Sequence, residues 1–198
     1  MTHKERRVRE KEQMRQRLLD AGLELVSKKG VSALTIRSLA EHISYSTSIV
    51  YEYFESKEEI YKELNILVTK RLLFALQSVP KPETPDEYLI ELVKVNIGFF
   101  EHNHHLIELL SLECFGKDAA DKPVEFTEIR ALFGKALKNC DCKRLKTVED
   151  YERALNVIRS LRVGMLILSQ YETSHEGLKR IANSLEDGIT DLLRGWRH

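Results

Sequence analysis

The sequence predicts an all-α protein, in which a small helix-turn-helix segment precedes a larger helical part. Apolar residues recur every three or four positions along most of the chain, as they do on one face of a helix. The chain has only four prolines, and Pro80, Pro82 and Pro85 form a single cluster that no helix can cross. Residues 35–57 carry the pattern of two short helices joined by a tight turn.

Composition narrows the class of protein. The 198 residues are 42% hydrophobic and 31% charged, as in a soluble globular protein. No apolar run approaches the roughly 20 residues that cross a bilayer, and the highly charged start lacks the apolar stretch of a secretory signal. Three cysteines are too few for a disulfide framework. We therefore expect a cytoplasmic protein.

The formal net charge is zero, but its distribution is uneven. Residues 1–17 hold seven Lys or Arg side chains against three Glu, a local charge of +4. Binding to phosphates needs only a local basic surface. A merely solvated terminus would have the same composition, and the motif that follows favours the interpretation that this surface binds DNA.

The first helix is expected over residues 5–28, and Gly30 ends it after a basic last turn. The second opens at Thr35, and Ser44 with Tyr45 forms the turn that follows it.

Ser46 stands where its hydroxyl can cap a short third helix. Tyr51 is expected to face outward there, and Tyr53 inward with Phe54. Ser56 and Glu59 then match a capping box for a fourth helix that ends near residue 78.

Beyond the proline cluster, the apolar spacing predicts further helices over residues 86–101, 106–114, 124–139, 148–171 and 174–193. A polar loop is expected over residues 116–123.

These residues resemble the tetracycline-repressor (TetR) family of transcription regulators. The resemblance is carried by Gly30, Thr35, Ile36, Leu39-Ala40, Ser46, Val50-Tyr51-Glu52-Tyr53-Phe54 and Ser56-Lys57-Glu58-Glu59-Ile60. It covers about a quarter of the chain. Three positions depart from the family pattern: Ser44 replaces the glycine of the turn, Tyr45 replaces the small hydrophobic residue after it, and Ser48 replaces a glycine common in the third helix. Since such turns often need a positive φ, Ser44 is the costlier departure.

The resemblance implies a DNA-binding domain over residues 1–55 and an effector-binding and dimerisation domain over residues 56–198. Tyr45, Thr47 and Ser48 are the expected readers of base edges, and Arg37 matches a position that reaches a base, where its guanidinium suits guanine. Phosphate contacts are expected from Thr35, Ser46, Tyr51 and Lys57. Each could instead be only a cap or an exposed polar residue.

One short recognition helix buries little surface, so specific binding is expected from a homodimer on a pseudo-palindromic operator. The helix over residues 148–171 is apolar around much of its circumference, which favours burial on two sides. Gly164 in its middle favours a close helix approach, although burial within one subunit is the alternative.

In the TetR family the second domain binds a small molecule that releases DNA, so this chain is expected to be a repressor with an unknown effector. Apolar and polar candidates for that site are Tyr88, Asn96, Phe99, Phe100, Phe126, Phe133, Arg162 and Met165. Each of them could equally be packed core. A domain that recruits a protein partner in place of a ligand is the alternative function.

Two clusters could bind a metal or respond to oxidation: His102, His104 and His105, and the pair Cys140 and Cys142. Neither has a complete set of ligands, so no metal and no cofactor are expected. The chain lacks a phosphate-binding glycine loop, a nucleophile elbow and a Glu-x-x-His pair, and we therefore expect no enzyme.

Overall fold

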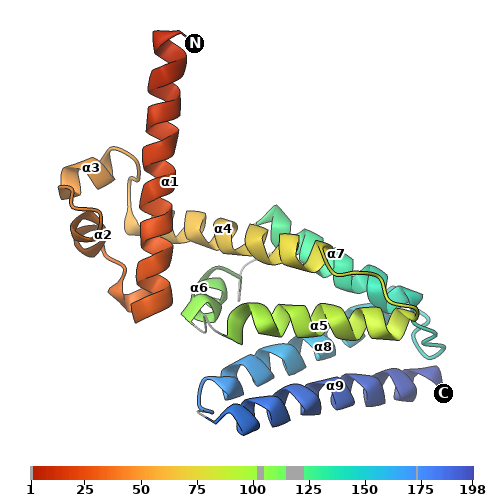
Figure 1. The fold of residues 1–198 in the computed structure, drawn as a ribbon. Helices are drawn as coiled ribbons and strands as arrows, with labels where there is room; N and C mark the ends of the chain where they lie inside the picture. The colour runs from red at the N-terminus through yellow and green to blue at the C-terminus, as the bar shows by residue number, and fades with distance from the viewer. Residues whose placement is uncertain (1, 102–104, 115–122, 173) are drawn as a thin grey trace. The chain divides into compact units, whose positions relative to one another are not determined.

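A computed structural model describes residues 2–101, 105–114, 123–172 and 174–198 (Figure 1). Within these ranges every regular element is helical, which confirms the predicted all-α fold. The elements are α1 (His3–Lys29), the 3₁₀ turn η1 (Val31–Ala33), α2 (Ile36–His42), α3 (Thr47–Tyr51), α4 (Lys57–Gln77), α5 (Pro85–Glu101), α6 (His105–Cys114), α7 (Val124–Asn139), α8 (Val148–Ser169) and α9 (His175–Arg197). No helix of the described residues is long and apolar enough to cross a bilayer.

The chain forms two compact units. The described residues of Met1–Thr69 and His105–Asp121 make the first, and those of Lys70–His104 and Lys122–His198 make the second. Helix α4 therefore contributes its first half to one unit and its second half to the other. The functional boundary predicted between residues 55 and 56 stays a prediction.

In the first unit, α1 packs against α2 and α6, and α2 packs against α3. Its core is apolar and closed, with Leu18, Leu39, Val50 and Phe54 at most 1% exposed. The first buried residue of α1 is Leu18, so the basic N-terminal half of this helix extends in solvent beyond the core. A reciprocal capping box between Thr2 and Glu5 closes its first turn.

Gly30 ends α1 in a conformation that suits only glycine. Its φ is 83° and its ψ 169°, and its N–H donates to the Val26 carbonyl at 2.8 Å. A Cβ built on Gly30 would lie 3.3 Å from Nδ1 of His105 on α6. The glycine thus permits both the sharp exit from α1 and the close approach of α6.

Replacing Gly30 with alanine should destabilise the protein by about 1–3 kcal/mol, because a non-glycine residue is strained at this φ and ψ. Thermal or urea unfolding of the full chain measures the effect. Gly98→Ala is the matched control, because a Cβ at Gly98 on α5 has open space around it. If Gly30→Ala and Gly98→Ala were equally stable, a side chain at position 30 would cause no backbone strain, and the prediction would be wrong.

Buried polar groups join α4 to α6 within the same unit. Nδ2 of Asn65 donates to the Leu109 carbonyl at 3.3 Å, and the Thr69 hydroxyl donates to the Asn65 carbonyl at 2.8 Å. Asn65 and Thr69 are at most 1% exposed, so these bonds meet the polar needs of side chains that water does not reach.

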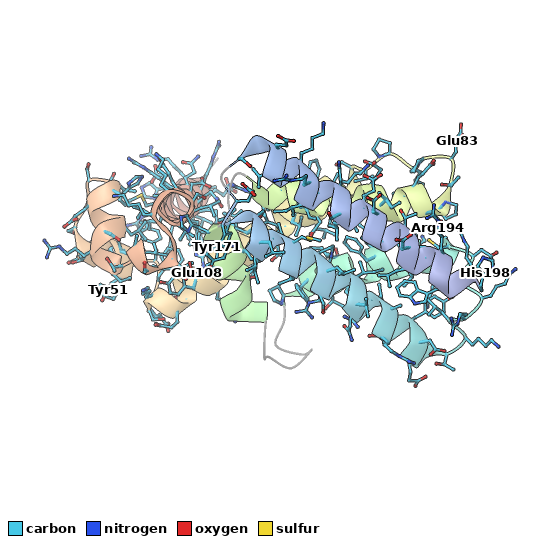
Figure 2. All side chains as sticks on the ribbon, turned by 90° about the horizontal axis from the view of Figure 1, so that it is seen from below. Tyr51, Glu83, Glu108, Tyr171, Arg194 and His198 are labelled. Atoms are coloured by element: carbon cyan, nitrogen blue, oxygen red, sulfur yellow. The ribbon has the colours of Figure 1, made fainter. Side chains whose placement is uncertain are left out.

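In the second unit, α5 packs against α7, α8 and α9, and α8 pairs with both α7 and α9. The proline cluster lies between α4 and α5, and Pro85 opens α5 at a first-turn position whose N–H would be unpaired in any case. Figure 2 shows Tyr171 at the turn between α8 and α9, with His198 at the other end of the pair. Helix α9 runs to Arg197, beyond the predicted end at residue 193, and Arg197 forms an ion pair with Asp86 of α5.

Candidate nucleic-acid interface

The turn between α2 and α3 rests on one left-handed residue. Ser44 has φ 61°, the one positive φ among the described non-glycine residues. The N–H of Tyr45 donates to the Ala40 carbonyl at 2.9 Å and that of Ser44 to the Glu41 carbonyl at 3.1 Å, so the chain reverses directly after α2. The turn therefore keeps the conformation that favours glycine, although serine occupies it.

Ser44→Gly should stabilise the protein by about 0.5–1 kcal/mol relative to Ser44→Ala, because only the alanine variant keeps the left-handed strain of a Cβ. Both variants lack the hydroxyl, so their difference in unfolding free energy reports the backbone conformation alone. An alanine variant as stable as the glycine variant would contradict the left-handed turn.

Helix α3 presents a polar face on an apolar base. Val50 is fully buried and Ile49 half-buried, whereas Thr47, Ser48 and Tyr51 are exposed. Tyr51 is 58% exposed, and Figure 2 shows it at the outer edge of the first unit. Three hydroxyl-bearing side chains, which can form hydrogen bonds with DNA, are thus exposed on the outer side of a helix whose inner side is held in the core by Val50.

Tyr53 and Phe54 bear out the predicted inward side of this segment. Phe54 is 1% exposed and Tyr53 half-buried. The guanidinium of Arg15 lies over the Phe54 ring, 4.9 Å from its centroid. This contact ties the segment between α3 and α4 to α1.

The predicted capping by Ser46 is wrong in part. Ser46 occupies the N-cap position of α3 with extended backbone, but its side chain makes no capping hydrogen bond. The Ser46 carbonyl accepts from the Ile49 N–H at 3.1 Å, while the Ser46 hydroxyl is exposed and makes no capping bond. An exposed hydroxyl can donate to a phosphate oxygen.

Helix α2 carries Thr35 and Arg37 on the surface. Thr35 caps the helix in a reciprocal box with Ser38, so its structural role is established and a phosphate contact would be additional. Nε of Arg37 lies 2.8 Å from Oε1 of Glu41, and the Arg37 side chain is 84% exposed. The hydrogen bond to Glu41, and then its charge, raise the pKa of Arg37. Arg37 is therefore charged and accessible, and its predicted contact with a base, which stays a prediction, would require it to leave Glu41.

Lys57 stands at the first position of α4 and is held by an aromatic ring. Its Nζ lies 4.9 Å from the centroid of Tyr61, and the Tyr61 hydroxyl donates to the Val31 carbonyl at 2.9 Å. An ammonium at a helix N-terminus is mildly unfavourable, and the cation–π contact offsets part of this.

The predicted capping box at the start of α4 is half wrong. Ser56 does accept from the Glu59 N–H at 3.2 Å, but the Glu59 carboxylate accepts from the N–H of Glu55 rather than Ser56. The carboxylate therefore fixes the residue before the cap, and α4 still begins at the predicted place.

Two arginines of α1 have roles that sequence spacing does not reveal. Arg15 pairs with Glu63 at 3.2 Å and Glu59 at 3.8 Å, and the hydrogen bond to Glu63 raises its pKa. Arg15 therefore holds α1 against α4. Arg17 lies over the Tyr45 ring, 5.5 Å from the centroid, and so positions a predicted base reader. Both contacts join residues far apart in the sequence, which no local pattern can indicate.

The predicted effector residues lie on three helices of the second unit. Asn96 and Phe100 of α5 are buried, Tyr88 and Phe99 are half-buried, and the rings of Phe99 and Phe100 meet edge to face at 5.0 Å. Met165 of α8 lines a cavity of about 130 Å³ formed by α5, α8 and α9.

A second group of effector candidates comes together between α7 and α8. The guanidinium of Arg162 stacks on the Phe133 ring, 4.0 Å from its centroid. One turn away, Arg159 lies over Phe126 at 5.6 Å. Three of the eight predicted residues thus share one cluster.

The cysteine pair has the character of packed side chains. Cys140 and Cys142 are both buried. Burial first, and then the charge of Asp86, raise the pKa of both thiols, that of Cys140 to about 12. Thiols that resist ionisation are poor nucleophiles and poor redox sensors.

Of the histidine cluster, only His105 falls within the described residues, where it packs against Gly30, whereas His102 and His104 lie outside them. Among the described residues no group of three or more His, Cys, Asp or Glu is arranged to hold a metal ion.

Comparison with known proteins adds two findings. Residues 18–64 match the model of bacterial regulatory proteins of the tetR family. The search of curated proteins found no match.

Solved structures similar to the whole chain include a TetR-like regulator from Rhodococcus sp. RHA1 (19% identity, 91% of this chain and 95% of that chain, TM-score 0.67). The TetR family regulator PfmR from Thermus thermophilus is 19% identical, with 90% of this chain and 97% of that chain covered and a TM-score of 0.66. BioQ, solved with its double-stranded DNA operator, is 17% identical, with 87% of this chain and 98% of that chain covered and a TM-score of 0.63.

Proposed function

We propose that this chain is a DNA-binding transcription regulator of the tetR family and that it acts as a dimeric, ligand-responsive repressor, on the strength of the family match over residues 18–64 and of the fold that it shares with solved regulators of this kind. Two copies would bind a pseudo-palindromic operator through α3, and a small-molecule effector would release them. Such a protein works where the DNA is, so the proposal includes a cytoplasmic location.

The observation that carries the proposal is the outer face of α3. Thr47, Ser48 and Tyr51 point outward from a helix whose buried side, Val50, is fully packed. Thr47 and Ser48 would read base edges, and Tyr51 would contact a phosphate. Arg37 and Tyr45 flank the same segment, and Lys57 follows it with an ammonium already oriented by Tyr61.

The dimer is supported by an apolar face that α8 leaves uncovered. Val157, Leu161, Gly164 and Leu168 recur along one stripe of the helix, and Val157 and Leu168 are 38% and 56% exposed. They line an open groove of about 840 Å³. A helix with this much uncovered apolar surface is stabilised by a partner.

Helix α9 continues that face. Gly188, Leu192 and Gly195 lie along one side of α9 and line a second groove together with Val157 of α8. A Cβ built on Gly164, Gly188 or Gly195 meets nothing within 4 Å in this chain, so no described neighbour within the subunit requires these glycines. Their small size instead suits the close approach of a second copy of α8 and α9.

The test is selection of bound duplexes from a random pool by the full-length chain. The proposal predicts recovery of an inverted repeat whose half-sites lie about one DNA turn apart, or a multiple of it. Binding should weaken steeply as salt rises, because phosphate contacts release counterions. Recovery of no common sequence, with equal affinity for all duplexes, would contradict operator recognition.

A further inference from the structure

Arg162 of α8 holds a positive charge that the fold does not satisfy. Its Nε and Nη1 atoms are out of contact with solvent, and neither has a hydrogen-bond partner in the part of the chain that the structure describes. These two nitrogens carry three N–H groups. Buried donors in proteins are almost always paired, so an arginine left in this state indicates a missing acceptor.

Electrostatics identify the missing group as an anion. Burial first, and then the nearby charge of Arg159, lower the pKa of Arg162 to about 10, so the guanidinium remains protonated at neutral pH. On α8 and its neighbour α7, Glu152 is paired with Arg130, and Glu125 is paired with Lys70 at 3.6 Å. These carboxylates already have cationic partners. Arg162 as a whole is half-buried, but two of its three nitrogens have lost water without gaining an acceptor, and an incoming anion would relieve this cost.

The surroundings of Arg162 define the shape of that anion. The Phe133 ring covers one side of the guanidinium, with 4.0 Å between Cζ of Arg162 and the ring centroid, so the unpaired Nε and Nη1 donors need acceptors on the sides that the ring leaves open. A carboxylate is planar and accepts two parallel N–H bonds from such a fork. Phe133 itself is buried, whereas the half-buried ring of Phe126, 5.6 Å from Cζ of Arg159, offers aromatic surface that suits an apolar body attached to the acid.

We infer that Arg162 is the anchor for the carboxylate of an amphipathic organic acid, whose apolar body packs against Phe126 of α7. This inference rests on the proposed effector function and names the chemical class of the effector.

The experiment is calorimetric titration of the full-length protein with straight-chain carboxylates from butanoate to dodecanoate and with 3-phenylpropanoate. Each acid is compared with its primary amide, which keeps the body and removes the charge. At least one acid should bind about 10- to 100-fold more tightly than its amide, as expected for hydrogen bonds to a charged group. If no acid binds more tightly than its amide, or if inorganic phosphate binds as well as the best acid, the inference is wrong.

Variants separate this site from general charge effects. Arg162→Met should remove the preference for acid over amide, and Arg162→Lys should restore only part of it, because an ammonium lacks the planar fork. Arg180→Met is the matched control, since Arg180 is an exposed arginine of α9, and it should bind the acids like the wild type. An unchanged preference in Arg162→Met would overturn the assignment.

A measurement without ligand tests the unpaired charge itself. The melting temperature of Arg162→Met should equal or exceed that of the wild type, because the substitution removes an unsatisfied buried charge and keeps the apolar stem. A clear drop would show that Arg162 is already satisfied, and would overturn the inference.

A final arm, binding of the selected operator with and without the best acid, separates the inference from the proposed function. Acid binding through Arg162 that leaves operator affinity unchanged would contradict effector release and leave the anion site standing.

Discussion

Glutamate in place of both Val157 and Leu168 should convert the protein from a dimer to a monomer and lower its operator affinity at least about 100-fold. Dimerisation would bury these partly exposed side chains against a second copy, and two carboxylates in that apolar contact would lose their hydration without gaining partners. A monomer presents one recognition helix and loses the contribution of the second half-site. Sedimentation equilibrium measures the mass against the 23.0 kDa of one chain.

Phe74→Glu provides the matched control for this variant. Phe74 lies on α4, is 72% exposed, and stands outside the proposed face, so the same change there should leave the dimer intact. A double variant that remains dimeric and binds operator like the wild type would show that the face of α8 is not the interface. Circular dichroism of both variants distinguishes loss of dimer from loss of fold.

Alanine at Arg37 and alanine at Lys57 should each weaken operator binding, but in different ways. Arg37→Ala should remove about 1–3 kcal/mol of binding free energy and relax the preference at one base position, since a guanidinium fork reads guanine. Lys57→Ala should weaken binding to all duplexes alike and reduce the slope of log affinity against log salt by about 0.9. Titrations of matched and mutated duplexes at several salt concentrations measure both effects.

Glu41→Gln is the informative companion to Arg37→Ala. It removes the carboxylate that holds Arg37 at 2.8 Å in the unbound protein, so operator binding should become tighter.

If Lys57→Ala left affinity and salt slope unchanged, the assignment of Lys57 to a phosphate contact would be wrong. Uniform weakening by Arg37→Ala across all duplexes would make Arg37 a phosphate contact as well.

Much of the fold could be predicted because its signals are local. Thr35 caps a helix that begins at the predicted place, and Gly30 ends α1 where its φ requires a glycine. The recognition segment was also predictable, because the inward side of Val50 and Phe54 follows from helical periodicity.

The parts that could not be predicted depend on contacts between distant residues. The missing cap bond of Ser46 and the shifted partner of Glu59 depend on how the first turns of α3 and α4 are oriented by their neighbours. From its position in the sequence, Arg162 is one polar residue among many. Only the packing of α7 against α8 shows that Phe133 lies beside its guanidinium and that Nε and Nη1 have no described partner.

In the proposed complex, α3 enters the major groove of duplex DNA twice, once from each subunit of a symmetric pair. Methylation interference at guanine N7, which lies in the major groove, measures this contact on the selected operator. We expect interference in two segments related by a dyad, about 34 Å apart or a multiple of it. Interference in a single segment, or tight binding that N7 methylation does not affect, would contradict it.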